Sequence, residues 1–168
     1  MDFSDIKIGD KIFLSGTIYT GRDAAHKLMF DMVKSGRPLP FDIREQAMYY
    51  TGPCPPKPGR AIGPCGPTTS SRMDKFTPAL LEMGLKITIG KGFRSGAVID
   101  SMVRNKCLYL AAVGGTGALL SKCVTRTEVV AFAELGTEAV YRLSVKDFPA
   151  TVAIDIYGNN LFAEGARR

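Results

Sequence analysis

Long apolar runs are missing from this chain of 168 residues. No stretch reaches the roughly 18 consecutive apolar residues that a membrane-spanning helix requires, so we expect no such helix and no membrane partner. The N-terminal residues MDFSDIKIGD contain three aspartates, two of them within the first five positions, and no apolar core segment, which is untypical of a secretory signal. We therefore expect a soluble protein located in the cytoplasm.

Closely spaced cysteines are also missing. The four cysteines stand at positions 54, 65, 107 and 123, and no two have C-x-x-C spacing. This disfavours a zinc ribbon or a ferredoxin-type cluster, and disulfides are not expected in a cytosolic chain. Cys107 and Cys123 lie in apolar segments and are expected in the core. Cys54 and Cys65 lie in loops rich in glycine and proline, where a thiol can be reactive, and their role stays open.

Complete nucleotide-binding motifs and nucleic-acid signatures are missing as well. GLKITIGKG approaches a P-loop, but Gly92 stands where a serine or threonine would bind magnesium. GGTGALL approaches a dinucleotide turn, but Leu120 stands where the third glycine belongs. The formal charge is +6, yet no basic run contains interleaved aromatic residues, so nucleic acid is not an expected partner. An ordinary solvated surface, an anionic ligand and an acidic protein partner all remain compatible with this charge.

The residues that are present predict one α/β domain spanning 1–168. Hydrophobic residues make up 45% and charged residues 23% of the chain, which is typical of globular proteins. Strands are expected at 11–19, 85–90 and 107–113, with helices following position 20 and at 77–84, 95–105 and 117–122. Six prolines between 53 and 67 predict an ordered loop or a linker. The alternation favours a layered α/β fold, and the strand-rich last third suggests a second sheet.

Two arginines are expected at helix starts. Thr20 to Asp23 matches a capping box with Thr20 as the N-cap, which places Arg22 in the first helical turn. A cation there opposes the helix dipole by about 0.3–1 kcal/mol, so Arg22 is either an exposed residue that tolerates this cost or one that shares an anion with the helix N-terminus. Residues 71–74 match a second capping box, which gives Arg72 the same position.

Hydroxyl groups and a lysine are expected beside these arginines. Thr68 and Thr69 come just before Arg72, and Lys91 follows the strand at 85–90. Ligands of α/β sheets gather beyond the carboxyl ends of strands, so three cations and several hydroxyls there predict a site for a small dianion. No general base is obvious, because the single histidine, His26, lies one turn beyond Arg22 and is expected to be structural or at the surface.

Four segments together resemble a known family: LSGTIYTGRDAAHK, GPCPPKPG, IGPCGPTTSSRMD and GLKITIGKG. They are similar to the β subunit of two-subunit class I fumarases and L-tartrate dehydratases, which corresponds to the C-terminal domain of single-chain class I fumarases. The resemblance implies a swivelling β/β/α fold with layered sheets and helices. It also implies an iron–sulfur hydro-lyase that reversibly hydrates a dicarboxylate, with fumarate to malate preferred over the tartrate reaction.

The resemblance further implies which groups act. The [4Fe-4S] cluster belongs to an α subunit that holds it through three cysteines, and its open iron acts as a Lewis acid; this chain supplies no metal ligand. Arg22, Arg72 and Lys91 match carboxylate-binding cations, Thr69 is a further candidate for substrate binding, and Thr68 matches a threonine proposed as the base. Thr68 could instead only hydrogen-bond the substrate or cap the helix.

The family also suggests an α2β2 heterotetramer. Cys54 and Cys65 depart from its usual pattern, because those positions more often carry small residues or threonine. A function from another class stays open beside the enzyme: a non-catalytic module that binds a dicarboxylate or another anion for regulation.

Overall fold

The computed structural model describes residues 1–113 and 116–165. The glycine pair 114–115 of the partial dinucleotide motif therefore lies outside the described residues. The strands are β1 (Lys11–Thr20), β2 (Ala47–Tyr49), β3 (Ile87–Gly90), β4 (Leu108–Ala111), β5 (Val124–Ala131) and β6 (Val140–Ile154). The α-helices are α1 (Asp23–Lys34), α2 (Thr77–Glu82), α3 (Gly96–Asn105), α4 (Gly117–Leu120) and α5 (Leu161–Gly165). The 3₁₀ helices are η1 (Ser70–Met73), η2 (Ser121–Cys123) and η3 (Ala133–Glu138).

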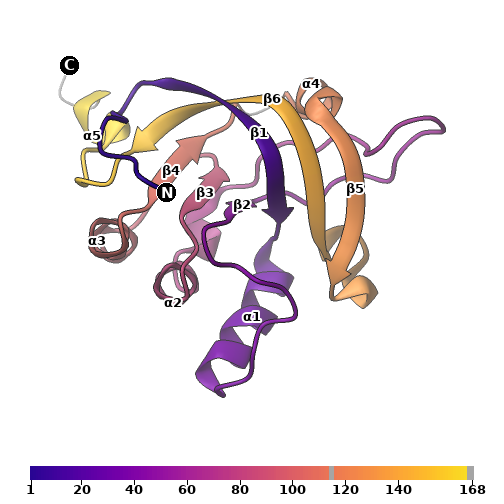
Figure 1. The fold of residues 1–168 in the computed structure, drawn as a ribbon, viewed down its shortest axis with the longest axis horizontal. Helices are drawn as coiled ribbons and strands as arrows, with labels where there is room; N and C mark the ends of the chain where they lie inside the picture. The colour runs from indigo at the N-terminus through magenta and orange to yellow at the C-terminus, as the bar shows by residue number, and fades with distance from the viewer. Residues whose placement is uncertain (114–115, 166–168) are drawn as a thin grey trace.

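The strands form a small mixed barrel. Their order in the sheet is β1-β2-β3-β4-β6-β5, and β1 also pairs with β6, so β1, β2, β3, β4 and β6 close a five-stranded ring (Figure 1). The contacts β1–β2, β2–β3 and β3–β4 are parallel, whereas β6 runs antiparallel to β1, β4 and β5. The result is a mixed α/β architecture in which β5 extends the barrel along one edge.

The last two strands do not form the second sheet that the sequence suggested. β6 is 15 residues long, so its first half pairs with β5 and β1 while its second half pairs with β4 and β1. One strand of this length bridges both ends of the parallel set and thereby closes it. In the part of the chain that the structure describes, all six strands therefore belong to one sheet.

Apolar residues are buried on both sides of the parallel strands, as expected for strands covered on both faces. One core cluster includes Tyr49, Ile89 and Phe148, and a second includes Met29, Leu80 and Met102 from the helices α1, α2 and α3. These three helices lie along one side of the barrel, below β2, β3 and β4 in Figure 1. Their positions agree with the expected helices, although the bounds differ by a few residues.

Both expected capping boxes are wrong. Thr20 is the last residue of β1, is fully buried, and its Oγ1 accepts a hydrogen bond from the backbone N–H of Tyr141 at 3.1 Å. Arg22 takes the N-cap position of α1 instead, without a side-chain cap bond. Asp74 accepts from Arg94 and from the backbone N–H of Ser95 and so is not part of a capping box. In both cases the side chain that the local pattern assigned to a helix cap is hydrogen-bonded to a residue farther along the chain. Thr20 binds Tyr141, and Asp74 binds Arg94.

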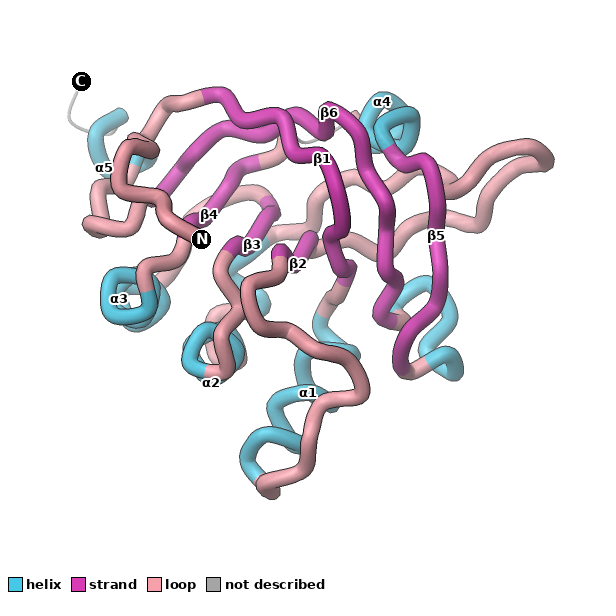
Figure 2. The backbone as a smooth tube through the Cα atoms, in the orientation of Figure 1, coloured by secondary structure: helices cyan, strands magenta, loops and turns pink. Residues whose placement is uncertain are grey.

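The proline-rich segment 53–67 is an ordered loop without helix or strand. Its two ends are joined by backbone hydrogen bonds from Cys54 to Pro64 at 2.9 Å and from Gly63 to Cys54 at 3.1 Å. Figure 2 shows it as a long loop that projects from the barrel beside β5. Separately, none of the helices within residues 1–113 and 116–165 has the length and hydropathy to cross a bilayer.

Candidate functional site

The carboxyl ends of the parallel strands gather the predicted residues along one edge of the barrel. Arg22 follows β1, Gly52 follows β2 and Lys91 follows β3. Parallel strands necessarily end at the same edge, which is where ligands of such sheets bind. The structure thus brings the segments that carry Arg22 and Lys91 to one side of the molecule, although the two residues are 69 positions apart in the sequence.

Thr68 and Thr69 are held beside Lys91 by backbone hydrogen bonds. The N–H of Thr68 donates to the carbonyl oxygen of Tyr50 at 2.7 Å, and its carbonyl oxygen accepts from the N–H of Lys91 at 3.3 Å. The N–H of Ser70 donates to the carbonyl oxygen of Lys91 at 2.9 Å, so the segment forms a short parallel bridge with the end of β3. Thr68 is half-buried, while Thr69 and Lys91 are exposed. Three of the candidate residues therefore lie together on a fixed backbone.

Glycine at position 90 permits this close approach. A Cβ atom there would lie 2.1 Å from Ser70 Oγ and 2.9 Å from a ring carbon of Tyr50. Real contacts of this kind do not occur, so any other residue would push the segment 68–70 away from β3. The first glycine of the G-K-G pattern is thus explained by packing beneath Thr68 and not by a bound nucleotide.

Arg22 carries a donor without a protein partner. Its Nε is buried and, among the described residues, makes no hydrogen bond. The carboxylates of Asp23 and Glu138 lie 3.9 and 3.8 Å away, beyond hydrogen-bond distance. Buried N–H groups are nearly always paired in folded proteins, so an unpaired one on a cation indicates capacity for an anion. The side chain as a whole is 29% exposed, so parts of Arg22 other than the covered Nε reach the surface.

Arg72 lies in a helical turn, as expected, but its guanidinium is paired with a carboxylate. It lies third in η1, which is only four residues long, and Thr68 precedes that helix instead of lying one turn away within it. Its guanidinium binds Asp23 through two hydrogen bonds, Nε to Oδ1 at 3.0 Å and Nη2 to Oδ2 at 2.7 Å. Among the described residues, no hydrogen bond or ion pair joins Arg72 to Thr68 or Lys91. An open cavity of about 350 Å³ is lined here by charged side chains and by Ala24 and Phe76, the charged ones being Asp23, Lys27, Arg72, Lys75 and Glu138.

His26 lies buried beneath Arg22 and is structural. Its Nδ1 is 2.8 Å from the carbonyl oxygen of Arg22, so the neutral ring donates its proton there. Its ring also meets Tyr50 edge-on, with centroids 5.2 Å apart. Burial lowers the pKa of His26 to about 4. A neutral and buried imidazole supports the backbone that carries Arg22 and is not accessible as a general base.

Acid is expected to destabilise the fold through His26. The unfolded chain takes up a proton near the ordinary pKa of 6.5, whereas the folded chain resists protonation until about pH 4. The free energy of unfolding should therefore be unaffected by this residue above about pH 7 and should fall by about 3 kcal/mol as the pH drops through that window. Urea unfolding at several pH values measures how steeply the free energy of unfolding falls with pH, and His26→Gln should remove the contribution of His26 to that slope. An identical slope in both proteins would contradict the assignment.

Gly52 determines where the Arg22 side chain lies. A Cβ at position 52 would stand 2.9 Å from Cδ of Arg22 and 3.2 Å from the carbonyl oxygen of Thr137. In Gly52→Ala we expect the flexible arginine to move, so the melting temperature changes little while affinity for a small dianion falls about tenfold, as for loss of one charge-assisted hydrogen bond. Gly96→Ala is the matched control, because nothing lies within 4 Å of its added methyl group. Calorimetric titration with a small dianion would test this, and unchanged affinity in Gly52→Ala would refute it.

Sequence reasoning missed Arg94, which connects the segments around the site. Its side chain is fully buried and its Nε donates to Asp74 Oδ1 at 2.7 Å. Its two terminal nitrogens donate to Tyr50, Thr77 and Thr88 at 2.8 to 3.2 Å. The guanidinium also lies about 5 Å from the ring centroids of Tyr50 and Tyr109. No periodic pattern marks an arginine in a loop as buried, so only the tertiary structure reveals it.

The cysteines of this chain do not fit an iron–sulfur cluster. Burial raises the pKa of Cys65 to about 12 and that of Cys107 to about 11, which disfavours the thiolate that iron requires. Cys54 is exposed and Cys123 is half-buried. Cys107 lies in the core as expected, whereas Cys123 only packs against its edge. Within the described ranges, no group of three or more histidine, cysteine, aspartate or glutamate residues is arranged to hold a metal ion.

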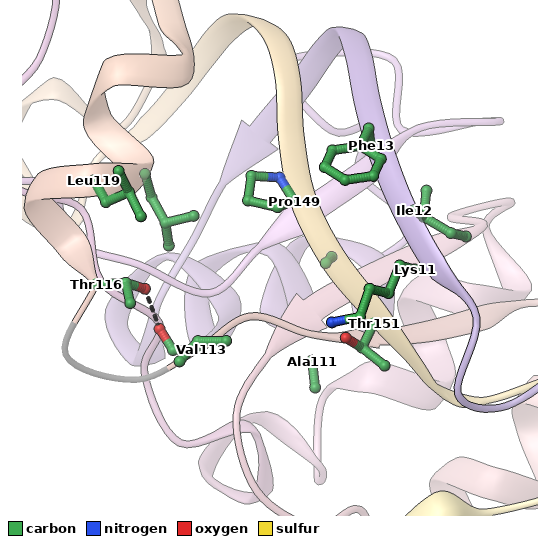
Figure 3. Close-up of a pocket in the computed structure, with 11 residues that line it drawn as sticks. Lys11, Ile12, Phe13, Ala111, Val113, Thr116, Leu119, Pro149 and Thr151 are labelled. Atoms are coloured by element: carbon green, nitrogen blue, oxygen red, sulfur yellow. Dashed lines mark hydrogen bonds between the residues drawn. The ribbon is translucent and has the colours of Figure 1, made fainter.

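An apolar pocket lies apart from these residues. Figure 3 shows it between β1, β6 and the segment that follows β4, with Phe13, Leu119 and Pro149 along its wall. None of the five candidate residues lines it. It therefore contributes nothing to the predicted dianion site.

Comparison with known proteins agrees with the resemblance seen in the sequence. The sequence model described as "Fumarase C-terminus" matches residues 1–165. The chain is 37% identical over 163 residues to fumarate hydratase 2 of Leishmania major, covering 96% of this chain and 29% of that protein. It is 36% identical over 163 residues to the anaerobic class I fumarate hydratase of Escherichia coli, covering 96% of this chain and 30% of that protein.

A relative of similar length is the L(+)-tartrate dehydratase subunit beta of Escherichia coli. The two are 35% identical over 171 residues, covering 99% of this chain and 84% of that subunit. The chain thus spans less than a third of the fumarate hydratases named above but most of this subunit. With a family match that runs through nearly the whole barrel and its helices, the chain belongs to the Fumarase C-terminus family.

Proposed function

We propose that this chain is the β subunit of an iron–sulfur hydro-lyase that reversibly hydrates a dicarboxylate, with fumarate to malate as the favoured reaction. The observation that carries the proposal is the arrangement at the carboxyl edge of the barrel. Thr68 is fixed between Tyr50 and Lys91 by its backbone, and Arg22 offers an unpaired buried donor along the same edge. Family membership supports the reaction class, because the relatives are named as fumarate hydratases and a tartrate dehydratase subunit.

In this proposal Arg22, Lys91 and Arg72 bind the carboxylates of the substrate, and the exposed Thr69 adds a hydroxyl contact. Each charge-assisted hydrogen bond contributes about 1.5–3 kcal/mol, enough together for micromolar to millimolar binding after the cost of association. Fixing both ends of a small dianion also orients the carbon atom that loses or gains a proton.

Thr68 is proposed as the group that takes the proton from carbon. A threonine hydroxyl is a poor base in water, and it becomes effective only where cations and exclusion of water stabilise the alkoxide. The backbone bond to Lys91 keeps that residue adjacent, and the half-buried position of Thr68 favours a dry site once a partner covers it. On this view the barrel is a swivelling β/β/α domain, with 1–168 as one unit, that closes over the reacting centre.

The cluster is proposed to reside in a separate α subunit, since the cysteines of this chain do not fit it. An α2β2 heterotetramer in the cytoplasm is the proposed assembly. The test is reconstitution: this chain alone should be colourless and inactive, and addition of a cluster-bearing α subunit should produce dehydration of malate. If no activity appeared with any plausible α subunit and dicarboxylate, the proposal would be wrong. A non-catalytic anion-binding module would then be the better account.

Tartrate is the second candidate substrate, and one observation favours it. The chain matches most of a separate tartrate dehydratase subunit, whereas it matches less than a third of the fumarate hydratases compared above. Fumarate hydration and tartrate dehydration differ in hydroxyl groups near the reacting carbons, which residues of the α subunit would contact. Turnover of the reconstituted pair on malate and on both tartrate isomers separates the two.

A further inference from the structure

The bond between Asp23 and Arg72 joins two segments 49 residues apart. Asp23 is the first residue of α1, a helix of 12 residues, and Arg72 lies in η1. A carboxylate in the first helical turn is stabilised by the helix dipole, which makes it a well-held acceptor. The two parallel hydrogen bonds, at 3.0 and 2.7 Å, fix the plane of the guanidinium as well as its distance. Asp23 therefore determines how Arg72 is oriented.

This contact leaves the other edge of Arg72 available. Asp23 occupies Nε and one N–H of Nη2, whereas a guanidinium has five N–H groups in a planar fork. Among the described residues nothing accepts from Nη1 or from the second N–H of Nη2, and the side chain is 50% exposed. A second carboxylate can bind the edge formed by Nη1 and Nη2 while Asp23 stays in place. Arg72 can thus be bound by protein on one side and by ligand on the other.

Asp23 also lies beside the second arginine. Its Oδ2 is 3.9 Å from Nε of Arg22, the donor that has no partner. One carboxylate thus stands next to both arginines and limits their mutual repulsion. A small anion that bridges the two would meet one cation that Asp23 already holds in place and a second one beside it.

We propose that Asp23 is a positioning residue for the dicarboxylate site. It holds Arg72 so that its free edge faces one carboxylate of the substrate, next to Arg22. This inference rests on the proposed function, because it takes Arg72 as a residue that touches substrate. The competing account is that Asp23 acts only through its charge and weakens the attraction of the site for a dianion. The two accounts predict opposite signs when the charge is removed.

The test is Asp23→Asn in the assembled enzyme, compared with Asp31→Asn as the control. Asp31 lies on the same helix and pairs with Lys27 at 3.3 Å, exposed and remote from both arginines. In Asp23→Asn an NH₂ group faces Nη2 of Arg72, so we expect KM to rise about 10-fold to 100-fold with kcat within about threefold, the pattern of lost uniform binding. Asp23→Glu, which restores the carboxylate on a longer side chain, should recover part of the affinity.

An unchanged KM in Asp23→Asn, or a lower one, would overturn the positioning role, the lower value being the result expected from charge alone. A variant with reduced melting temperature and wild-type kinetics would overturn it as well, because a purely structural contact behaves in that way.

A second measurement does not depend on turnover. The Nε–H resonance of Arg72, identified by its absence in Arg72→Lys, should exchange slowly with solvent in the wild-type chain and rapidly in Asp23→Asn. Slow exchange that persists in Asp23→Asn would refute the inference. If the wild-type chain shows no hydro-lyase activity together with an α subunit, the proposed function fails. The Nε–H resonance of Arg72 still decides in that case whether Asp23 holds Arg72.

Discussion

On the proposed function, replacing Thr68 with alanine is expected to lower kcat of the assembled enzyme by about two to four orders of magnitude, the usual contribution of a positioned general base. The loss should be confined to chemistry, because the contacts that hold residue 68 come from its backbone, with Tyr50 at 2.7 Å and Lys91 at 3.3 Å. The variant should therefore fold, bind the α subunit and bind the substrate with nearly unchanged KM. Pre-steady-state and steady-state turnover on malate are the measurements.

Two further variants serve as controls for Thr68→Ala. Thr68→Ser retains the hydroxyl and should recover most of the activity, whereas Ser71→Ala removes an exposed hydroxyl three residues away and should have no effect. Retention of kcat within about tenfold in Thr68→Ala would mean that the hydroxyl only contacts the substrate, since a missing hydrogen bond costs about that much. In that case the base must be sought in the α subunit.

Replacing Arg94 with methionine is expected to destabilise the protein by about 3–5 kcal/mol, the cost of removing one partner from a buried ion pair. Asp74, only 12% exposed, would be left without its cation, and the hydroxyl groups of Tyr50, Thr77 and Thr88 would lose a donor. Methionine fills the space without branching, so the effect reports the lost charge and hydrogen bonds more than a cavity. Chemical denaturation at neutral pH measures the change.

The control for Arg94 is Arg104→Met. Arg104 also pairs with a carboxylate, Glu82 at 3.7 Å, but both side chains are 61% exposed, and such pairs contribute about 0–1 kcal/mol. The double variant Arg94→Met with Asp74→Asn should regain part of the lost stability, because the unpaired buried charge is gone. Equal effects of Arg94→Met and Arg104→Met would show that the buried network contributes little.

Arg94 also affects the candidate site through Tyr50. That tyrosine accepts from Arg94 with its hydroxyl and from Thr68 with its carbonyl oxygen. Without Arg94 the ring of Tyr50 would be held less firmly, which would disturb the Tyr50 carbonyl group that fixes the backbone of Thr68. The Arg94 variant should accordingly lose activity at temperatures where it is still folded.

Local sequence patterns predict the strands β1, β3 and β4 and the helices α1, α2 and α3, and they place Arg22 and Lys91 just after strands. They do not predict β2, which has only three residues. Buried strands such as β3 and β4 are short apolar runs, and α3 is capped by Ser95, whose Oγ accepts from the backbone N–H of Val98. Neighbours in sequence therefore determine the strands and the start of this helix. The resemblance of the sequence to one family likewise depends only on the order of residues, and the family match confirms it.

The tertiary structure decided what depends on distant partners. Thr20 and Asp23 form a capping box by local pattern, yet Thr20 bonds to Tyr141 and Asp23 to Arg72. β6 closes the barrel because a strand of 15 residues reaches three neighbours at once, which no local periodicity encodes. The same holds for Arg72: its sequence position indicates a cation near a helix start, and only folding brings Asp23 to its side. The physical reason is that hydrogen bonds and ion pairs form between groups that are close in space, and the competition among them is settled only when the chain is packed.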